Sequence, residues 1–329
     1  MRVTLNGQPK DIAPTLTLSV LVRQLGRDPR HIVAEINGEI VPRDSWDRTR
    51  LKDHDTIELL NFVGGGERGE DAPLVIAGKS FGNRFFLGTG KFKNKADLQE
   101  SITASGTEMV TVALRRIDLD RHEDNILEYI PSEVTVMVNT SGARSAQEAI
   151  RIARLARECG YGNWIKIEVI NDTKYLLPDN TQTVIATKTL AREGFIVLPY
   201  VSPDLYAARA LQEAGAAAVM PLGSLIGSNQ GLLSKEWIHI LIKEIDLPII
   251  VDAGIGAPSQ AAEAMEMGAA AVLVNTAVAT ANAPARLARA FSLAVRSGRL
   301  GYLSGLPPRR SAAHASSPLT HLLSGLEAP

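Results

Sequence analysis

The sequence has 329 residues, which is long for one ordinary domain and comfortable for two. Hydrophobic residues make up 45% of the chain and charged residues 22%, near the average for globular proteins, so a wholly disordered chain is excluded. The 35 basic and 36 acidic side chains leave a net charge of −1, without the basic excess of a nucleic-acid-binding protein. We expect two folded units that bind no nucleic acid.

Three further features narrow the class of protein. The longest apolar runs, such as residues 247–251, fall far short of the roughly 20 residues that a membrane span requires. The single cysteine, Cys159, cannot form an internal disulfide, and the 6 histidines show no metal-ligand spacing. The amino terminus alternates like a strand and lacks the apolar core of a signal peptide. These features predict a cytoplasmic protein with no membrane partner and no metal site.

Residues 1–66 carry the short alternating runs of a small α+β domain. Asn6-Gly7 and Asn37-Gly38 each lie between such runs and predict β-hairpins, because Asn-Gly tolerates the positive φ angles of a type I′ turn. Residues 18–25 have the apolar spacing of a helix, and residues 56–63 form a last strand.

Two polar segments bound the rest of the chain. Three glycines at residues 64–66 are followed by a charged stretch, and we expect residues 67–73 to be an exposed linker. Residues 311–329, which are rich in Ser, Ala and Pro, predict a flexible tail.

Residues 74–310 alternate between strand-like runs and helical stretches. Eight strand-like runs occur, at residues 85–87, 109–114, 134–138, 164–170, 195–198, 217–220, 248–251 and 271–274. Helical stretches follow them, among them residues 143–158, 203–214, 258–267 and 284–297. Eight such units predict an α/β fold of the (β/α)8 TIM barrel type; a doubly wound open sheet is the alternative, although it usually needs fewer strands.

The first candidate for chemistry is the strand at residues 164–170. Its alternation puts Lys166 and Glu168 on one face and apolar residues on the other. Inside a barrel, desolvation would lower the pKa of Lys166, and a neutral amine condenses with carbonyl groups. Glu168 could then move protons. The alternative is a surface ion pair, which the apolar surroundings disfavour.

The second and third candidates follow later strands. Asp252 ends the seventh strand as a possible acid or base, and Gly254 lets backbone amides approach an anion; the alternative is an aspartate that only holds loop amides. Asn275-Thr276 follows the eighth strand, and barrels often bind phosphate in these two loops. Residues 223–231 form a glycine-containing loop that binds a ligand or is simply flexible.

Several other motifs favour structural roles. Gly88-Thr89-Gly90-Lys91 lacks the four intervening residues of a Walker loop and predicts a tight turn. Cys159 lies near a helix end, and we expect it to have no catalytic role. Arg115-Arg116 could meet an anion or only solvent, and both alternatives stay open.

Five longer motifs together resemble the thiazole synthases of thiamin biosynthesis, the ThiG family. They are LGTGK at 87–91, IKIEVI at 165–170, EGFIVLPY at 193–200, VDAGIG at 251–256 and VNTAV at 274–278. Residues 1–66 resemble ThiS, the ubiquitin-like β-grasp sulfur carrier, mainly through the tail that ends in Gly65-Gly66.

The resemblance implies a reaction and roles for residues. In the family, 1-deoxy-D-xylulose 5-phosphate forms an imine with a lysine, a carrier thiocarboxylate supplies sulfur, and dehydroglycine closes the ring, without a cofactor. Lys166 matches the Schiff-base lysine, and Glu168 and Asp252 match the acid and base. The positions that match substrate and phosphate binding are Gly227, Ala253, Gly254, Asn275 and Thr276.

One feature departs from the family pattern. The carrier needs a free terminal carboxylate for its adenylating enzyme, but Gly66 is followed directly by Glu67. The hypothesis is that the chain is cut after Gly66, or that a separate carrier delivers sulfur.

Two alternative functions are a class I aldolase acting on a sugar phosphate and a non-catalytic scaffold fusion. Barrels of this kind often form homo-oligomers through their outer helices, which we expect here.

Overall fold

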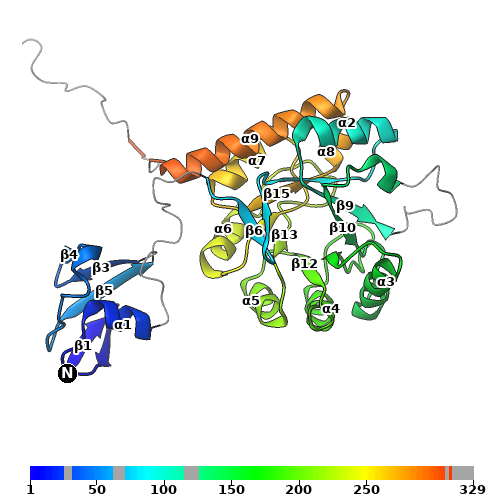
Figure 1. Ribbon diagram of the computed structural model, residues 1–329. Coiled ribbons are helices and arrows are strands. Elements are labelled where there is room, and N and C mark those ends of the chain that lie inside the picture. The colour runs from blue at the N-terminus through cyan, green and yellow to red at the C-terminus, as the bar shows by residue number, and fades with distance from the viewer. Residues whose placement is uncertain (26–31, 62–70, 115–125, 308–310, 313–329) are drawn as a thin grey trace, which may run out of the picture.

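The computed structural model describes residues 1–25, 32–61, 71–114, 126–307 and 311–312 (Figure 1). Within these ranges the chain forms a small α+β domain and a barrel of parallel strands. Gly65 and Gly66 lie outside the described residues, as do Arg115-Arg116 and most of the predicted linker and tail.

The small domain is a five-stranded mixed sheet with one helix packed on it. Its elements are β1 (Arg2–Leu5), β2 (Gln8–Asp11), α1 (Leu18–Gln24), β3 (Ile32–Ile36), β4 (Glu39–Val41), the 3₁₀ turn η2 (Arg43–Ser45) and β5 (Thr56–Asn61), with sheet order β2-β1-β5-β3-β4. Both Asn-Gly pairs form the predicted hairpin turns, with positive φ at all four residues. Leu18, Leu21 and Ile57 lie in its buried core. The β-grasp expectation is confirmed.

The large domain is a barrel of eight parallel strands. They are β8 (Phe85–Gly88), β9 (Met109–Ala113), β10 (Thr135–Asn139), β11 (Trp164–Ile167), β12 (Ile196–Val201), β13 (Met220–Pro221), β14 (Ile250–Val251) and β15 (Ala271–Val274). The seam between β13 and β14 is closed by backbone bonds from Ile250 N–H to Val219 O (2.9 Å) and from Asp252 N–H to Pro221 O (3.0 Å). The sheet is therefore closed, and the open-sheet alternative is wrong.

Helices cover the outside of the barrel (Figure 1). They are α2 (Lys95–Ser105), η5 (Ile126–Tyr129), α3 (Ala146–Glu158), α4 (Asn180–Arg192), α5 (Leu205–Ala214), α6 (Lys235–Glu244), α7 (Pro258–Glu266), α8 (Thr276–Ala279) and α9 (Pro284–Ser304). Side-chain caps explain several starts: Asn94, Ser145, Asp179 and Asp204 each accept a backbone N–H three residues ahead. All four predicted helices are present.

A hairpin that the sequence did not predict plugs the amino end of the barrel. It consists of β6 (Leu74–Ile76) and β7 (Lys79–Phe81). The Phe81 ring packs edge-on against Trp164, the first residue of β11, and Lys79 Nζ donates to Thr135, the first residue of β10. The side chains of this hairpin join an apolar cluster with Phe86, Met109 and Leu198, so the interior at this end is largely apolar.

The chain enters the barrel domain through a charged clamp at the same end. Buried Arg84 donates to the carbonyl oxygens of Ala72 (2.7 Å) and Ala270 (2.9 Å), and Asp71 pairs with both Arg84 (3.4 Å) and Arg299 (3.0 Å). Arg84 and Ala270 immediately precede β8 and β15. The last linker residues are thus held at the end of the barrel opposite the carboxyl ends of the strands.

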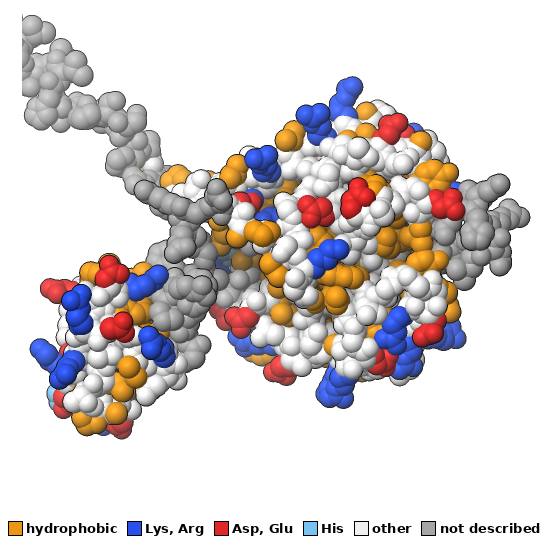
Figure 2. Space-filling view, viewed as in Figure 1, with side chains coloured by type: hydrophobic (Ala, Val, Ile, Leu, Met, Phe, Trp, Pro, Cys, Tyr) orange, Lys and Arg blue, Asp and Glu red, His pale blue; other side chains and the backbone are white. Residues whose placement is uncertain are grey.

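The surface indicates neither a membrane span nor a field of one sign. Among the described residues, no helix combines the length and the apolar character needed to cross a bilayer. On the face shown in Figure 2, basic and acidic side chains are interspersed over both domains.

Two glycines of α9 give a matched test of packing. Gly298 is buried, and a Cβ there would overlap the Ala262 carbonyl oxygen of α7, whereas a Cβ on Gly301 meets only ordinary contacts at 3.7 Å. We expect Gly298→Ala to destabilise the barrel by about 2 kcal/mol, lowering its melting temperature by about 5 °C. Gly301→Ala should be neutral or raise stability by about 0.5 kcal/mol, because alanine favours helix. Scanning calorimetry measures both, and equal shifts would contradict the packing role of Gly298.

Candidate active site

The strand β11 and the residue that follows it deliver two charged side chains to the barrel interior. Lys166 and Glu168 point inward, as the alternation predicted, while Ile165, Ile167 and Val169 pack outward among the alanines of α3 and α4. Thr140 fixes the end of this strand: its Oγ1 accepts the Glu168 N–H (2.8 Å) and donates to the Glu168 carbonyl (2.9 Å). The alternative of a surface ion pair is therefore excluded.

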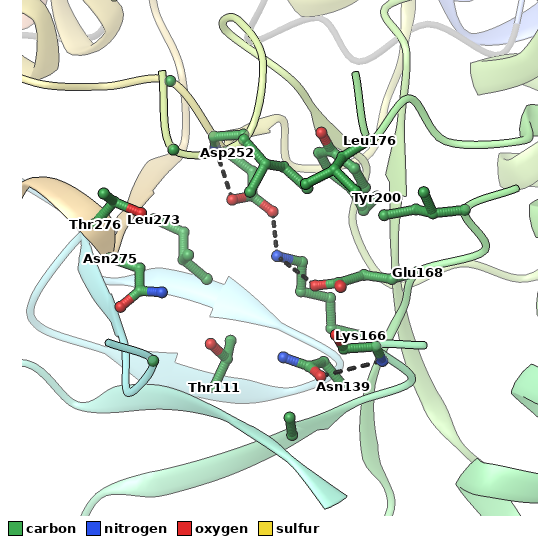
Figure 3. Close-up of a pocket in the computed structure, with 18 of the residues that line it drawn as sticks. Thr111, Asn139, Lys166, Glu168, Leu176, Tyr200, Asp252, Leu273, Asn275 and Thr276 are labelled. Carbon is green, nitrogen blue, oxygen red and sulfur yellow. Dashed lines mark hydrogen bonds and ion pairs between the residues drawn. The ribbon is translucent and has the colours of Figure 1, made fainter. Parts of the chain in front are cut away.

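Lys166 lies between two carboxylates (Figure 3). Its Nζ is 3.2 Å from Glu168 Oε1 and is paired still more closely with Asp252 Oδ2. All three residues are buried, with exposed fractions of 5%, 8% and 3% for Lys166, Glu168 and Asp252. The other Asp252 oxygen accepts the Ala253 N–H at 2.7 Å, which orients the carboxylate toward the lysine.

The carboxylates reverse the expected charge of the amine. Burial, the largest single influence, acts to lower the pKa of Lys166, but the charges and hydrogen bonds of Asp252 and Glu168 together outweigh it, so the pKa is raised above its ordinary value. The prediction of a lowered pKa is wrong for this arrangement. The raised pKa favours the protonated form of the Lys166 amine.

Tyr200 is a third neighbour of the amine, which reasoning from the sequence did not single out. Its ring centroid lies 5.3 Å from Lys166 Nζ, and its buried hydroxyl has no hydrogen-bond partner within the described part of the chain. Burial and the nearby charges of Asp252 and Glu168 raise its pKa, so it stays a neutral phenol. The period-two register of β12 could have identified it as an inward residue.

A cavity of about 450 Å³ opens above this cluster at the carboxyl ends of the strands. It is lined by every site residue that the sequence predicted within the described ranges: Lys166, Glu168, Asp252, Gly227, Ala253, Gly254, Asn275 and Thr276. No group of three or more His, Cys, Asp or Glu side chains in the described residues could hold a metal ion.

Close backbone approaches build one wall of the cavity. A Cβ on Gly254, which has φ +77°, would overlap Ser224 Oγ, so the loop at 223–231 packs directly on the turn after β14. A Cβ on Gly90 would lie 2.8 Å from Asn275 Nδ2. The segment after β8 is therefore part of the cavity wall, and the sequence interpretation of Gly88 to Lys91 as only a tight turn missed Lys91, which also lines the cavity.

Comparison with protein families assigns both domains. Residues 75–318 match the family of the thiazole biosynthesis protein ThiG, and residues 3–66 match the ThiS family. The thiazole synthase of Pelotomaculum thermopropionicum is 64% identical over 248 residues, covering 75% of this chain and 97% of the relative. The thiazole synthase of Moorella thermoacetica is 61% identical over 250 residues, covering 76% and 98%.

A solved structure agrees with this assignment. A chain from the crystal structure of the Amycolatopsis orientalis BexX/CysO complex is 34% identical to this protein with a TM-score of 0.66. The match covers 74% of this chain and all of the solved chain.

Removing the amine tests the electrostatics of the cluster. Lys166→Ala leaves two buried carboxylates without their cation, which should cost about 3 kcal/mol at pH 8. Protonation of one carboxylate relieves that cost, so the loss of melting temperature relative to the parent should be smaller at pH 5 than at pH 8. The raised pKa of Lys166 keeps its amine charged between pH 5 and pH 8 in the parent. Titration of this amine therefore does not change the parent's melting temperature over that range.

The matched control removes one of the two carboxylates as well. Lys166→Ala combined with Asp252→Asn should recover part of the melting temperature at pH 8 and lose most of the pH dependence. Equal deficits at pH 5 and pH 8 in the single variant would contradict the paired arrangement.

Proposed function

The chain belongs to the ThiG family and carries a ThiS-family domain in front of it, and we propose that it is the thiazole synthase of thiamin biosynthesis. Its substrates are 1-deoxy-D-xylulose 5-phosphate, dehydroglycine and the thiocarboxylate of a sulfur carrier. The observation that carries the proposal is the buried amine of Lys166 between Glu168 and Asp252 at the floor of the cavity.

The first step captures the ketone of the sugar phosphate. Asp252, the closer carboxylate, accepts a proton from the Lys166 ammonium, and the neutral amine adds to the carbonyl carbon. The carbinolamine hydroxyl receives a proton from a carboxylic acid of the cluster and leaves as water, forming the imine. Burial of the cluster limits access of bulk water to the imine.

Glu168 and Asp252 then move protons on the sugar carbons. The imine acidifies the neighbouring C–H, one carboxylate removes that proton, and the other returns a proton elsewhere, which shifts the carbonyl along the chain. Two carboxylates on opposite sides of one nitrogen suit this exchange, because either can act as base while the other is protonated. Carrier sulfur and dehydroglycine then complete the thiazole ring.

The phosphate group belongs at the wall built after β14 and β15. Gly227, Ala253, Gly254, Asn275 and Thr276 line this side of the cavity, and glycines at 227 and 254 with positive φ bring backbone close to a ligand. Neither the alternative aldolase nor a scaffold fusion would need both this site and an attached sulfur-carrier domain.

Sulfur delivery requires a free carrier terminus. Gly66 is only five residues from Asp71, so it reaches at most about 18 Å from the charged clamp at the amino end of the barrel. The clamp faces away from the catalytic mouth, which supports cleavage after Gly66 or the use of a separate carrier. In either case a carrier-adenylating enzyme is a required partner.

Borohydride trapping tests the imine. Reduction in the presence of 1-deoxy-D-xylulose 5-phosphate should add one sugar phosphate to the peptide that contains Lys166, detected by mass spectrometry. Lys166→Ala should abolish the adduct, and Asp252→Asn or Glu168→Gln should slow its formation about 100-fold. The control is Lys235→Ala, which removes a lysine that pairs with Glu263 outside the cavity. An adduct on another lysine would overturn the proposal.

Intact-mass measurement tests the route of sulfur. Protein isolated from its native host should contain a species cut after Gly66, or should make thiazole phosphate only when a separate carrier is added. A persistent full-length chain with full activity and no other carrier would contradict both versions.

A further inference from the structure

Among the described residues that line the cavity, Lys91 is the cation beside the phosphate wall that the reaction scheme above leaves unused. It follows β8, the strand next to β15 in the barrel, and its Nζ lies 2.9 Å from the point where a Cβ on Gly227 would stand. That same point is 3.5 Å from Thr276 Oγ1. The ammonium group of Lys91 therefore lies at the meeting point of two loops that line the proposed phosphate site.

The charges of the cavity show why an added cation matters. Among the described residues, six ionisable side chains that carry full charges line it, three basic and three acidic: Lys91, Arg144, Lys166, Glu168, Asp172 and Asp252. Lys166 is already paired with two carboxylates. Without Lys91 these described side chains would carry net negative charge and would repel a phosphate dianion.

The strand order places Arg144 and Lys91, the other two described cations of the lining, at different distances from β15. Arg144 follows β10, which is two strands from β8 and three from β15, whereas Lys91 follows the direct neighbour of β15. Among the described residues, no carboxylate forms an ion pair with Lys91. Lys91 is thus the cation placed to meet a group bound between Gly227 and Thr276.

The backbone at Lys91 is held in an unusual conformation. Its φ is +66°, a left-handed value that a residue with a long side chain adopts at a cost. The packing of Gly88 and Gly90 against Asn275 holds the preceding segment in place. The left-handed backbone and the close packing together direct the side chain of Lys91 toward the cavity, which it lines, instead of along the start of α2.

We propose that Lys91 is a binding residue for the phosphate of the substrate, supplying the positive side chain that the glycine-rich backbone wall lacks. The inference rests on the proposed function and adds to it a residue that selects phosphorylated over unphosphorylated ketoses. Its ammonium donates to a phosphate oxygen at the Gly227–Thr276 end of the cavity. Because Lys91 is exposed, its charge is partly screened, and its effect is on binding rather than on the chemical step.

The test compares the full chain with Lys91→Gln, using borohydride trapping of 1-deoxy-D-xylulose 5-phosphate and of unphosphorylated 1-deoxy-D-xylulose. We expect Lys91→Gln to raise the concentration of sugar phosphate that gives half-maximal trapping about tenfold, with the rate at saturation unchanged. Trapping of the unphosphorylated sugar should not change. Inorganic phosphate should compete less well against the sugar phosphate in the variant than in the parent.

Three further variants separate charge from backbone effects. Lys91→Arg should keep affinity for the sugar phosphate within about threefold of the parent, since it keeps the charge. Lys91→Gly relieves the left-handed φ but removes the charge, so it should behave like Lys91→Gln. Lys93→Gln, an exposed lysine two residues away that does not line the cavity, is the matched control and should behave like the parent.

The outcomes distinguish this inference from the proposed function. Equal effects of Lys91→Gln on both sugars, or none on either, would overturn the role of Lys91 while leaving the imine mechanism intact. If the parent forms no adduct with the sugar phosphate, the proposed function fails instead. The role of Lys91 would then be decided by the rise in melting temperature that inorganic phosphate produces, which should be larger for the parent than for Lys91→Gln.

Discussion

The ion pair of Lys166 with Asp252 and Glu168 is the interaction on which the site depends. Three charged groups within a closed barrel are tolerated because the ammonium group lies against both carboxylates, and removal of Lys166 leaves two uncompensated carboxylates in a poorly solvated place. The same arrangement underlies the proposed chemistry. It favours the protonated amine, and in the proposed reaction the nucleophile and its base are one hydrogen-bonded unit rather than separate residues.

The two ends of the barrel differ in the side chains that they carry. The amino end is filled by apolar side chains and closed by the β6–β7 hairpin, while the carboxyl end carries the charged cluster and the loops of the cavity. Residues with strained backbone gather at this second end: Lys91, Leu176, Asn229 and Ala253 all have positive φ and all line the cavity. The rigid apolar layer beneath them provides the support that such conformations require.

The fusion of two domains in one chain has a geometric consequence. The clamp of Asp71 by Arg84 and Arg299 attaches the carrier side of the chain to the closed end of the barrel, away from the cavity. Under the proposed function, covalent linkage therefore does not by itself bring the carrier tail to the cavity. It does place the two domains in one translated chain, and so in equal amounts.

Local sequence patterns determined most elements of this fold and the identity of the charged side chains that face its interior. Asn-Gly turns, eight apolar runs and the inward register of Lys166 and Glu168 follow from periods and turn preferences that neighbouring residues set among themselves. Tertiary structure alone decided three other features: the closure of β13 on β14, the plug formed by β6 and β7, and the convergence of Asp252 on Lys166. The raised pKa of Lys166 belongs to this second group, because the larger of the two charges that raise it is that of Asp252, 86 positions later in the chain, which only the closed barrel brings within contact.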